Sequence, residues 1–355
     1  MLKDGELAEL VLGQRELQAA DIPQVACERL LGLVPICASN LEQQLKQETY
    51  NAVAWEAAHR RVVSWALRLF AENAIDALVI KGTVLAYTLY AEPWQRCRVD
   101  TDVFIRESQI DAAVKLLEGA GFESGVSLPG RLATAELAFS LTDEFGVVHT
   151  LDLHWRLNNN WRLAQAISFE ELWAHKKSFP SLCPEALCPA DTASLLIACV
   201  HRAAHATEIA YERPWGSKPE SDLTLWIYDI HLLSEGITER DWQWVCEAAE
   251  RAKLCLIVAD GLQTSRNLFG TEIPVTVLKS LMDKDNQVSL EQMAQQASGE
   301  MTSLRAIPGF RNKLAFLVEQ LFPAASYMKA RYPGDGLLWA YVRRIVSGLL
   351  RRVSA

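Results

Sequence analysis

Residues 98–105 read RVDTDVFI, and this stretch decides how the rest of the chain is interpreted. Its apolar second half is typical of a buried β-strand. Successive side chains of a strand point to opposite faces, so Asp100 and Asp102 are expected on one face, about 6.5–7 Å apart. Two carboxylates at this spacing can hold a pair of divalent ions about 3.5–4 Å apart, an arrangement that supports in-line phosphoryl transfer. The strand therefore predicts a metal site suited to phosphate chemistry.

A second acidic strand is expected further along the chain, in a hairpin. Glu136–Leu141 and Val147–Trp155 fit the two arms, with turn residues between them. On the second arm, Asp152 and His154 alternate with an apolar face. A third carboxylate would complete the oxygen cage that a hard cation such as Mg²⁺ prefers. A solvated edge strand without a metal is the alternative explanation for both residues.

A glycine turn precedes the first acidic strand. Ala77–Ile80 is a short apolar run typical of a buried strand, and it leads into Lys81-Gly82-Thr83 and a short helix. A strand, a glycine turn and a helix can direct backbone N–H groups at a phosphate. Gly82 is expected to permit close approach of the backbone and to adopt a positive φ. A larger residue at this position should therefore weaken triphosphate binding more than it destabilises the fold.

The rest of the chain is predicted to be helical. We expect an N-terminal helical segment over residues 1–76, a mixed α and β core over 77–157, and a large all-α region over 158–355. The last helix, Gly336–Val353, is expected to bury Leu338 and to expose its arginines. No internal repeat or low-complexity segment is visible.

Two histidines on one predicted helix of this region invite two interpretations. His201 and His205 are four residues apart and could bind zinc, but Arg202 replaces the catalytic Glu of the HExxH pattern. We expect instead that helices carrying His201, His205 and Asp229 form the wall opposite the carboxylates, because these polar side chains interrupt apolar faces. The competing expectation is that the histidines are enclosed among the helices, away from Asp100.

Composition favours an ordinary cytoplasmic protein. The chain has 355 residues, of which 50% are hydrophobic and 22% charged, and its formal net charge is −9. A net negative surface does not attract nucleic acid by charge alone, so a nucleic-acid partner is not expected unless a local basic patch binds it. The acidic N-terminus does not fit a signal peptide, and no apolar run approaches the ~20 residues of a membrane span. We therefore expect no membrane partner.

The order of these motifs resembles that of the nucleotidyltransferase superfamily, which has a DNA polymerase β-like core. Lys81-Gly82, a helix, Arg96, Asp100-x-Asp102, a helix and the segment DLHW at 152–155 carry the resemblance. The chain is most similar to an uncharacterised bacterial nucleotidyltransferase family, over about residues 20–275. The resemblance implies an α+β fold, with a small mixed β-sheet core and helices, flanked by the N-terminal helical segment and the large C-terminal all-α region.

The resemblance also implies roles for particular residues. Asp100, Asp102 and Asp152 would be catalytic and would bind Mg²⁺, with two ions expected and Mn²⁺ as an alternative. The nucleotide would be bound by residues around the glycine turn, namely Lys81, Gly82, Thr83, Arg96 and Arg98. The donor would be a nucleoside triphosphate, most simply ATP, and pyrophosphate would be released. Arg98 adds a charge that the family pattern does not require.

The sequence leaves the acceptor, the oligomeric state and two rival functions open. A small molecule, a sugar, a peptide or a protein could each accept the nucleotide. A non-catalytic interaction module of the same fold is one rival, although three retained carboxylates argue against it. The other rival is a metal-dependent hydrolase that would use His154, His201, His205 and Asp229, but these residues lack a recognised ligand spacing.

Overall fold

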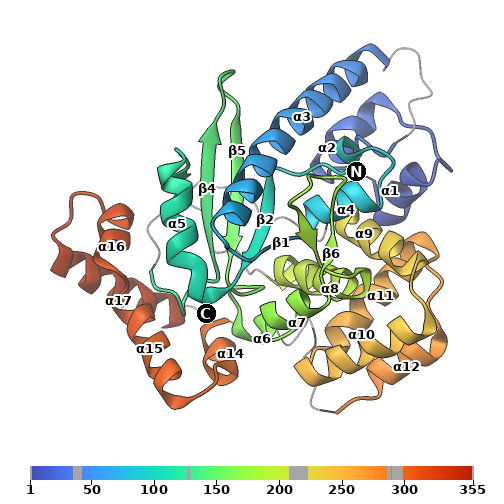
Figure 1. Cartoon of the computed structure of the whole chain (residues 1–355). Helices are drawn as coiled ribbons and strands as arrows, with labels where there is room; N and C mark the ends of the chain where they lie inside the picture. Colours follow the sequence, from blue (N-terminus) through green and yellow to red (C-terminus); the bar gives the residue numbers. More distant parts are fainter. Residues whose placement is uncertain are drawn as a thin grey trace.

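A five-stranded mixed β-sheet lies at the centre of the computed structural model (Figure 1). The structure describes residues 2–34, 42–125, 129–207, 223–285, 289 and 299–353. The strands are β1 (Ala77–Ile80), β2 (Asp100–Ile105), β3 (Glu123–Ser124), β4 (Glu136–Thr142) and β5 (Val148–His154), and a small sheet pairs β6 (Lys177–Ser178) with β7 (Leu187–Cys188). The helices are α1 (Asp4–Val11), η1 (Ala19–Asp21), α2 (Ile22–Cys27), α3 (Glu42–Glu72), α4 (Gly82–Thr88), η2 (Pro93–Gln95), η3 (Glu107–Gln109), α5 (Ile110–Gly119), α6 (Trp161–Ala164), α7 (Phe169–Ala174), α8 (Asp191–Thr207), α9 (Thr224–Glu235), α10 (Glu239–Ala252), α11 (Cys255–Phe269), α12 (Val275–Met282), α14 (Gly299–Ala306), α15 (Phe310–Leu321), α16 (Ala325–Arg331) and α17 (Leu337–Val353).

The strand order places the two acidic strands side by side. The order is β1-β2-β5-β4-β3, and β2 and β5 run parallel while the other neighbours run antiparallel. In this register Asp102 lies opposite Asp152. The predicted strand with the DTD sequence and the predicted hairpin are both confirmed, as is the α+β class.

The two faces of the sheet pack against different helices. Strand alternation sends Leu78 and Phe104 to one face, where they join a buried core with helices α8–α12. Val79 and Val103 point to the other face and pack with residues of α3 and α5. Asp102 precedes Val103 on the same strand, so its side chain lies on the face covered by α8.

The N-terminal helices pack against the helical half of the chain. α1 and α2 share a buried core with Leu225 and Ile227 of α9 and with Phe269 of α11. The core on the α3 side likewise joins residues before position 76 to the sheet, and continues past position 157 to the β6–β7 hairpin. Packing is therefore continuous across the expected boundaries at residues 76 and 157. The three-part division stays a prediction about chain organisation.

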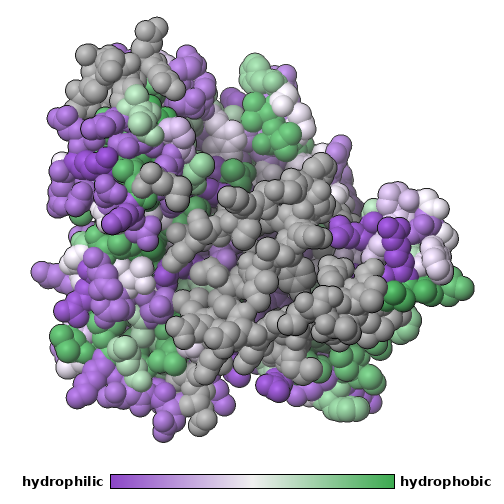
Figure 2. All heavy atoms as spheres, turned by 180° about the vertical axis from the view of Figure 1, so that it is seen from behind, coloured by the Kyte–Doolittle hydropathy of each residue, from purple (hydrophilic) through white to green (hydrophobic). Residues whose placement is uncertain are grey.

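The last helices, α14–α17, lie together at the edge of the molecule, where α14 packs against α6 (Figure 1). Glu319 of α15 accepts hydrogen bonds of 2.8 Å from the backbone N–H groups of Leu132 and Ala133. The expectation that Leu338 is buried is wrong: it is 81% exposed, because α17 buries its other side through Ala340. Figure 2 shows hydrophobic side chains on the surface of these helices and at the tip of the β4–β5 hairpin, where Phe145 is exposed. Within the described residues, no helix is long and apolar enough to cross a bilayer.

Candidate active site

Three carboxylates meet on the α8 face of the sheet. Asp100 and Asp102 alternate along β2 with Thr101, which is fully buried against the opposite face. Because β5 runs parallel to β2, Asp102 has Asp152 as its direct neighbour, and Asp100 has Thr150. The expected common face of Asp100 and Asp102 follows from this alternation. Neighbouring strands thus supply three acids to one place.

Lys81 and His154 complete this cluster. The ammonium Nζ of Lys81 donates to Oδ1 of Asp102 at 2.6 Å and lies 3.3 Å from Nε2 of His154. The same Nε2 lies 2.7 Å from Oδ1 of Asp102. His154 reaches the group because it lies two residues after Asp152 on β5, with its side chain on the same face.

Burial and mutual repulsion separate the pKa values of the three acids. Burial, together with the neighbouring Asp102, raises the pKa of Asp100 to about 6. Burial and the charges of Asp102 and Asp100 raise the pKa of Asp152 to about 7. Burial also opposes ionisation of Asp102, but the Lys81 ammonium and the hydrogen bond with His154 outweigh it and hold the pKa of Asp102 below its usual value. The cluster therefore carries negative charge that Lys81 compensates only in part.

The donor set of this cluster fits a divalent cation. Asp102, Asp152 and His154 each offer one ligand atom, and these atoms lie within 4.8 Å of one another. Oδ1 of Asp152 is buried and accepts no hydrogen bond from the part of the chain that the structure describes. The Lys81 ammonium already places a positive charge between Asp102 and His154. Two carboxylate oxygens, an imidazole nitrogen and a resident positive charge together mark a cation site.

The glycine turn before α4 is strained at Lys81 and not at Gly82. Lys81 has φ 55° and ψ −134°, whereas Gly82 is not among the residues with positive φ. The expectation of a positive φ at Gly82 is therefore wrong. Gly82 is needed for a different reason, because a Cβ built there would lie 2.5 Å from Nη1 of Arg96.

Thr83 and Arg98 turn toward α3, behind the carboxylates. Oγ1 of Thr83 lies 2.8 Å from Oγ1 of Thr101 and accepts a hydrogen bond from Nε of Arg98 at 3.1 Å. Nη2 of Arg98 donates to Glu56 of α3 at 2.6 Å. Nε2 of His59 lies 2.8 Å from the same Thr101 hydroxyl. These side chains join the turn, β2 and α3, and are directed away from the carboxylates.

Arg96 and Asp229 are brought together as a buried ion pair. Nε and Nη2 of Arg96 donate to the Asp229 carboxylate, the latter at 2.6 Å, and the two side chains are 6% and 3% exposed. The hydroxyl of Tyr90 donates to the same carboxylate at 2.7 Å. Arg96 therefore links the turn at Gly82 to helix α9.

His201 lies within electrostatic reach of the cluster. Burial lowers the pKa of His201 well below its usual value, the charge of Lys81 lowers it further, and Asp102 acts in the opposite direction. The His201 ring meets His205 on α8 at 4.5 Å and Trp226 on α9 at 5.2 Å between centroids. Two imidazoles on α8 and an indole on α9 therefore lie together on the helices that cover the carboxylate face.

Two residues of the site were missing from the sequence interpretation. Glu136 on β4 lies opposite His154 in the register, and its Oε2 is 3.2 Å from Nδ1 of that histidine. Counting outward from a four-residue turn at 143–146 would place Glu136 opposite Leu153, one residue short, because the hairpin closes from Asp143 to Val147. Arg29 follows α2, and its positive charge lowers the pKa of Asp100. No local signal connects Arg29 to β2, since the connection depends on how the N-terminal segment folds back.

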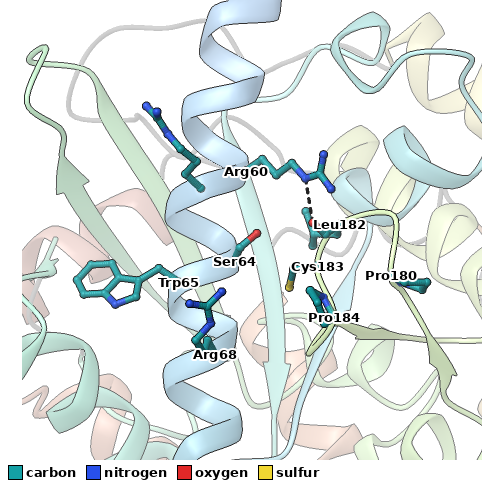
Figure 3. A pocket seen from close by; sticks show the side chains of 9 residues that line it. Arg60, Ser64, Trp65, Arg68, Pro180, Leu182, Cys183 and Pro184 are labelled. Atoms are coloured by element: carbon teal, nitrogen blue, oxygen red, sulfur yellow. Dashed lines mark hydrogen bonds between the residues drawn. The ribbon is translucent and has the colours of Figure 1, made fainter.

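Two pockets lie outside this cluster. One has a volume of about 510 Å³ and lies between α3 and residues 180–184, with Arg60, Ser64 and Arg68 among its lining residues (Figure 3). Arg60 is held there by its hydrogen bond to the carbonyl of Leu182 at 2.9 Å. Since α3 covers the other face of the sheet, this pocket does not contain the carboxylates. The second, about 1300 Å³, lies among α9–α12.

Comparison with known proteins places the chain in a family. No curated protein matches it. A sequence model described as "Uncharacterised nucleotidyltransferase" matches residues 18–270. The match includes the sheet, the three carboxylates, the N-terminal segment from α2 onward and the helices through α11. The chain therefore belongs to this uncharacterised nucleotidyltransferase family.

Proposed function

We propose that the protein transfers a nucleoside monophosphate from a nucleoside triphosphate to an acceptor and releases pyrophosphate. The observation that carries the proposal is the pairing of Asp102 with Asp152 across parallel strands, with the Lys81 ammonium 2.6 Å from Asp102. Such transfer depends mainly on positioning and on compensation of phosphate charge. ATP is the simplest donor, and the acceptor is a small molecule, a sugar, a peptide or a protein.

Each side chain has a distinct part in this proposal. Lys81 binds the triphosphate by turning its ammonium from Asp102 to a phosphate oxygen, and the backbone of Gly82 and Thr83 lies alongside the phosphates. Arg29 adds positive charge near Asp100. Arg96 and Arg98 are already held by Asp229 and Glu56, so they act by fixing the turn and β2.

The transfer forms one bond to phosphorus, breaks another, and passes the acceptor proton to the protein. The acceptor oxygen attacks the α-phosphorus, the bond from that phosphorus to the bridging oxygen of the β-phosphate breaks, and pyrophosphate leaves with the electron pair. Oδ1 of Asp152 takes the acceptor proton, consistent with its lack of a hydrogen-bond partner among the described residues. Divalent cations held by Asp100, Asp102 and Asp152, such as Mg²⁺ or Mn²⁺, would supply charge compensation when bound.

The helical half is proposed to hold the acceptor side of the site. His201 and His205 stand on α8, which covers the carboxylate face, and His201 is influenced by both Lys81 and Asp102. Asp229 contributes indirectly, because it is occupied by Arg96 and Tyr90. A cytoplasmic location would provide the triphosphate donor.

The test uses nucleoside triphosphates labelled at the α-phosphate, each offered with Mg²⁺ or Mn²⁺ and a cell extract as the source of acceptors. The proposal expects one labelled product and a matching amount of pyrophosphate, both lost in Asp102→Asn. Asp283→Asn, which changes an exposed aspartate after α12, is the matched control and should behave like wild type. Release of label only as free nucleotide, or equal labelling by Asp102→Asn, would contradict the proposal.

A further inference from the structure

An imidazole is built into the carboxylate cluster. His154 has a side chain only 1% exposed, and its Nε2 lies 2.7 Å from Oδ1 of Asp102. It lies on the same strand and face as Asp152. The ligand atoms of these three residues converge within 4.8 Å, so the set contains one nitrogen and two oxygens.

The Glu136 carboxylate lies behind this imidazole. Its Oε2 lies 3.2 Å from Nδ1 of His154, because β4 and β5 pair Glu136 with His154 directly. Asn159 holds Glu136 in turn, donating from Nδ2 to Oε1 at 3.3 Å, while its own Oδ1 accepts from the backbone N–H of Ala135 at 2.6 Å. The 2.7 Å contact of Nε2 with Oδ1 of Asp102 is a hydrogen bond that needs the ring proton on Nε2, and Nδ1 makes no hydrogen bond among the described residues. A metal ion at Nε2 would displace that proton, and the proton would then be held at Nδ1, next to the Glu136 carboxylate.

A cation already stands beside Nε2 of this imidazole. Nζ of Lys81 lies 3.3 Å from Nε2 of His154 and 2.6 Å from Oδ1 of Asp102. The ammonium thus contacts two of the three residues that converge, as a metal ion would. A carboxylate, an imidazole and a cation in line are the usual arrangement around a metal-binding histidine.

The ligand set discriminates between classes of ion. Mg²⁺ strongly prefers an all-oxygen environment. First-row transition ions accept an imidazole nitrogen together with carboxylates, and imidazole suits them better than it suits Mg²⁺. A site of two aspartates and one histidine therefore favours the second class.

We propose that His154, with Glu136 next to its Nδ1, is a metal ligand, and that this site binds a first-row transition-metal ion in preference to Mg²⁺. The inference rests on the proposed function for its biological meaning, since it names the ion used in nucleotide transfer. The three aspartates alone would supply only oxygen ligands. The proposed site adds the imidazole nitrogen of His154 to the carboxylate oxygens of Asp102 and Asp152.

Binding is measured on the full chain with Mn²⁺, whose free-ion electron paramagnetic resonance signal disappears on binding, and Mg²⁺ is then added as competitor. Wild type should bind Mn²⁺ more tightly than Mg²⁺. His154→Gln should reduce the ratio of the two affinities at least about 10-fold, and Glu136→Gln should weaken Mn²⁺ binding about 10-fold. His231→Gln, which removes an imidazole bonded to Thr271 instead, is the matched control and should change neither affinity.

Pulsed electron paramagnetic resonance on wild-type protein with Mn²⁺ tests the ligand without any substitution, so a variant that fails to fold does not decide the matter. Coupling to a histidine nitrogen is expected. Its absence, or an unchanged affinity ratio in a folded His154→Gln protein, overturns the inference. Nucleotide transfer with Mg²⁺ but no nitrogen coupling would contradict this inference and leave the proposed function intact. Nitrogen coupling without transfer from any triphosphate would instead contradict the proposed function.

Discussion

At the scale of single residues, the site combines charge and strain that stability alone does not explain. Lys81 adopts φ 55° although it has a side chain, a conformation that costs about 1–3 kcal/mol. Oδ1 of Asp152 is buried with no partner among the described residues. Features of this kind persist where a ligand makes use of them. The cluster is therefore expected to be stabilised by binding a cation.

Asp152→Asn should stabilise the metal-free protein, because it removes a carboxylate whose charge is opposed by burial and by the neighbouring Asp102 and Asp100. The expected gain in the free energy of unfolding, measured by thermal melting at pH 8 with a chelator, is about 1–3 kcal/mol. Addition of Mn²⁺ should raise the melting temperature of wild type and leave that of the variant unchanged. A variant that is less stable than wild type without metal would show that Asp152 is compensated in the fold.

Gly82→Ala should destabilise the fold as well as weaken triphosphate binding. Its Cβ would lie 2.5 Å from the Arg96 guanidinium, which cannot move freely because Asp229 holds it. A loss of about 1–3 kcal/mol in urea unfolding is expected. Gly119→Ala is the matched control, since nothing lies within 4 Å of its added Cβ. Equal stability of Gly82→Ala and wild type would mean that the Arg96 side chain moves aside without lowering the free energy of unfolding.

At the scale of elements, the sequence predicts more of the site than of its surroundings. Alternation along β2 and β5 is local, so the shared face of Asp100 and Asp102 and that of Asp152 and His154 could be read directly. The parallel pairing of the two strands is long-range and was not predicted; the resemblance implied only a mixed sheet. Contacts between distant segments, such as that of Arg96 with Asp229, leave no pattern in the sequence.

The Arg96–Asp229 pair is expected to fix α9 to the turn at Gly82. Arg96→Met should lose about 3–5 kcal/mol in urea unfolding, because it leaves the Asp229 carboxylate buried without its cation. Arg96→Met with Asp229→Leu should lose less than the single variant, since no buried charge remains. Arg251→Met, which breaks an exposed pair with Glu171, should lose less than about 1 kcal/mol. A double variant no better than the single one would exclude this explanation.

At the scale of the whole molecule, one side of the sheet packs against the helical half, and the carboxylates lie on this side. Helices α8–α12 share a core with Leu78 and Phe104, on the same face as the carboxylates. The N-terminal segment packs closely against η2, where a Cβ at Gly32 would lie 2.6 Å from the carbonyl oxygen of Gln95. The family match from residue 18 to 270 includes all of these parts except α12. Helices α14–α17 lie outside it.

A chain ending at Asp285 should therefore fold and keep its metal site. The three large buried cores contain no residue from α14–α17 among the described residues. The truncated chain is expected to unfold cooperatively, with a melting temperature within about 5 °C of the full chain, and to bind Mn²⁺ with unchanged affinity. Loss of cooperative unfolding would show that the C-terminal helices are part of the folding unit.

Nucleotide transfer by this site is tested by following the α-phosphate and the γ-phosphate of the donor in two parallel reactions. The protein is incubated with a divalent cation and a cell extract that supplies the acceptor. One sample receives ATP labelled at the α-phosphate, and a parallel sample receives ATP labelled at the γ-phosphate. The account predicts that the α-label enters the product while the γ-label appears in pyrophosphate, and that Asp102→Asn abolishes both. Transfer of the γ-label to the product, or its release as inorganic phosphate with no α-label transferred, would contradict nucleotide transfer by this site.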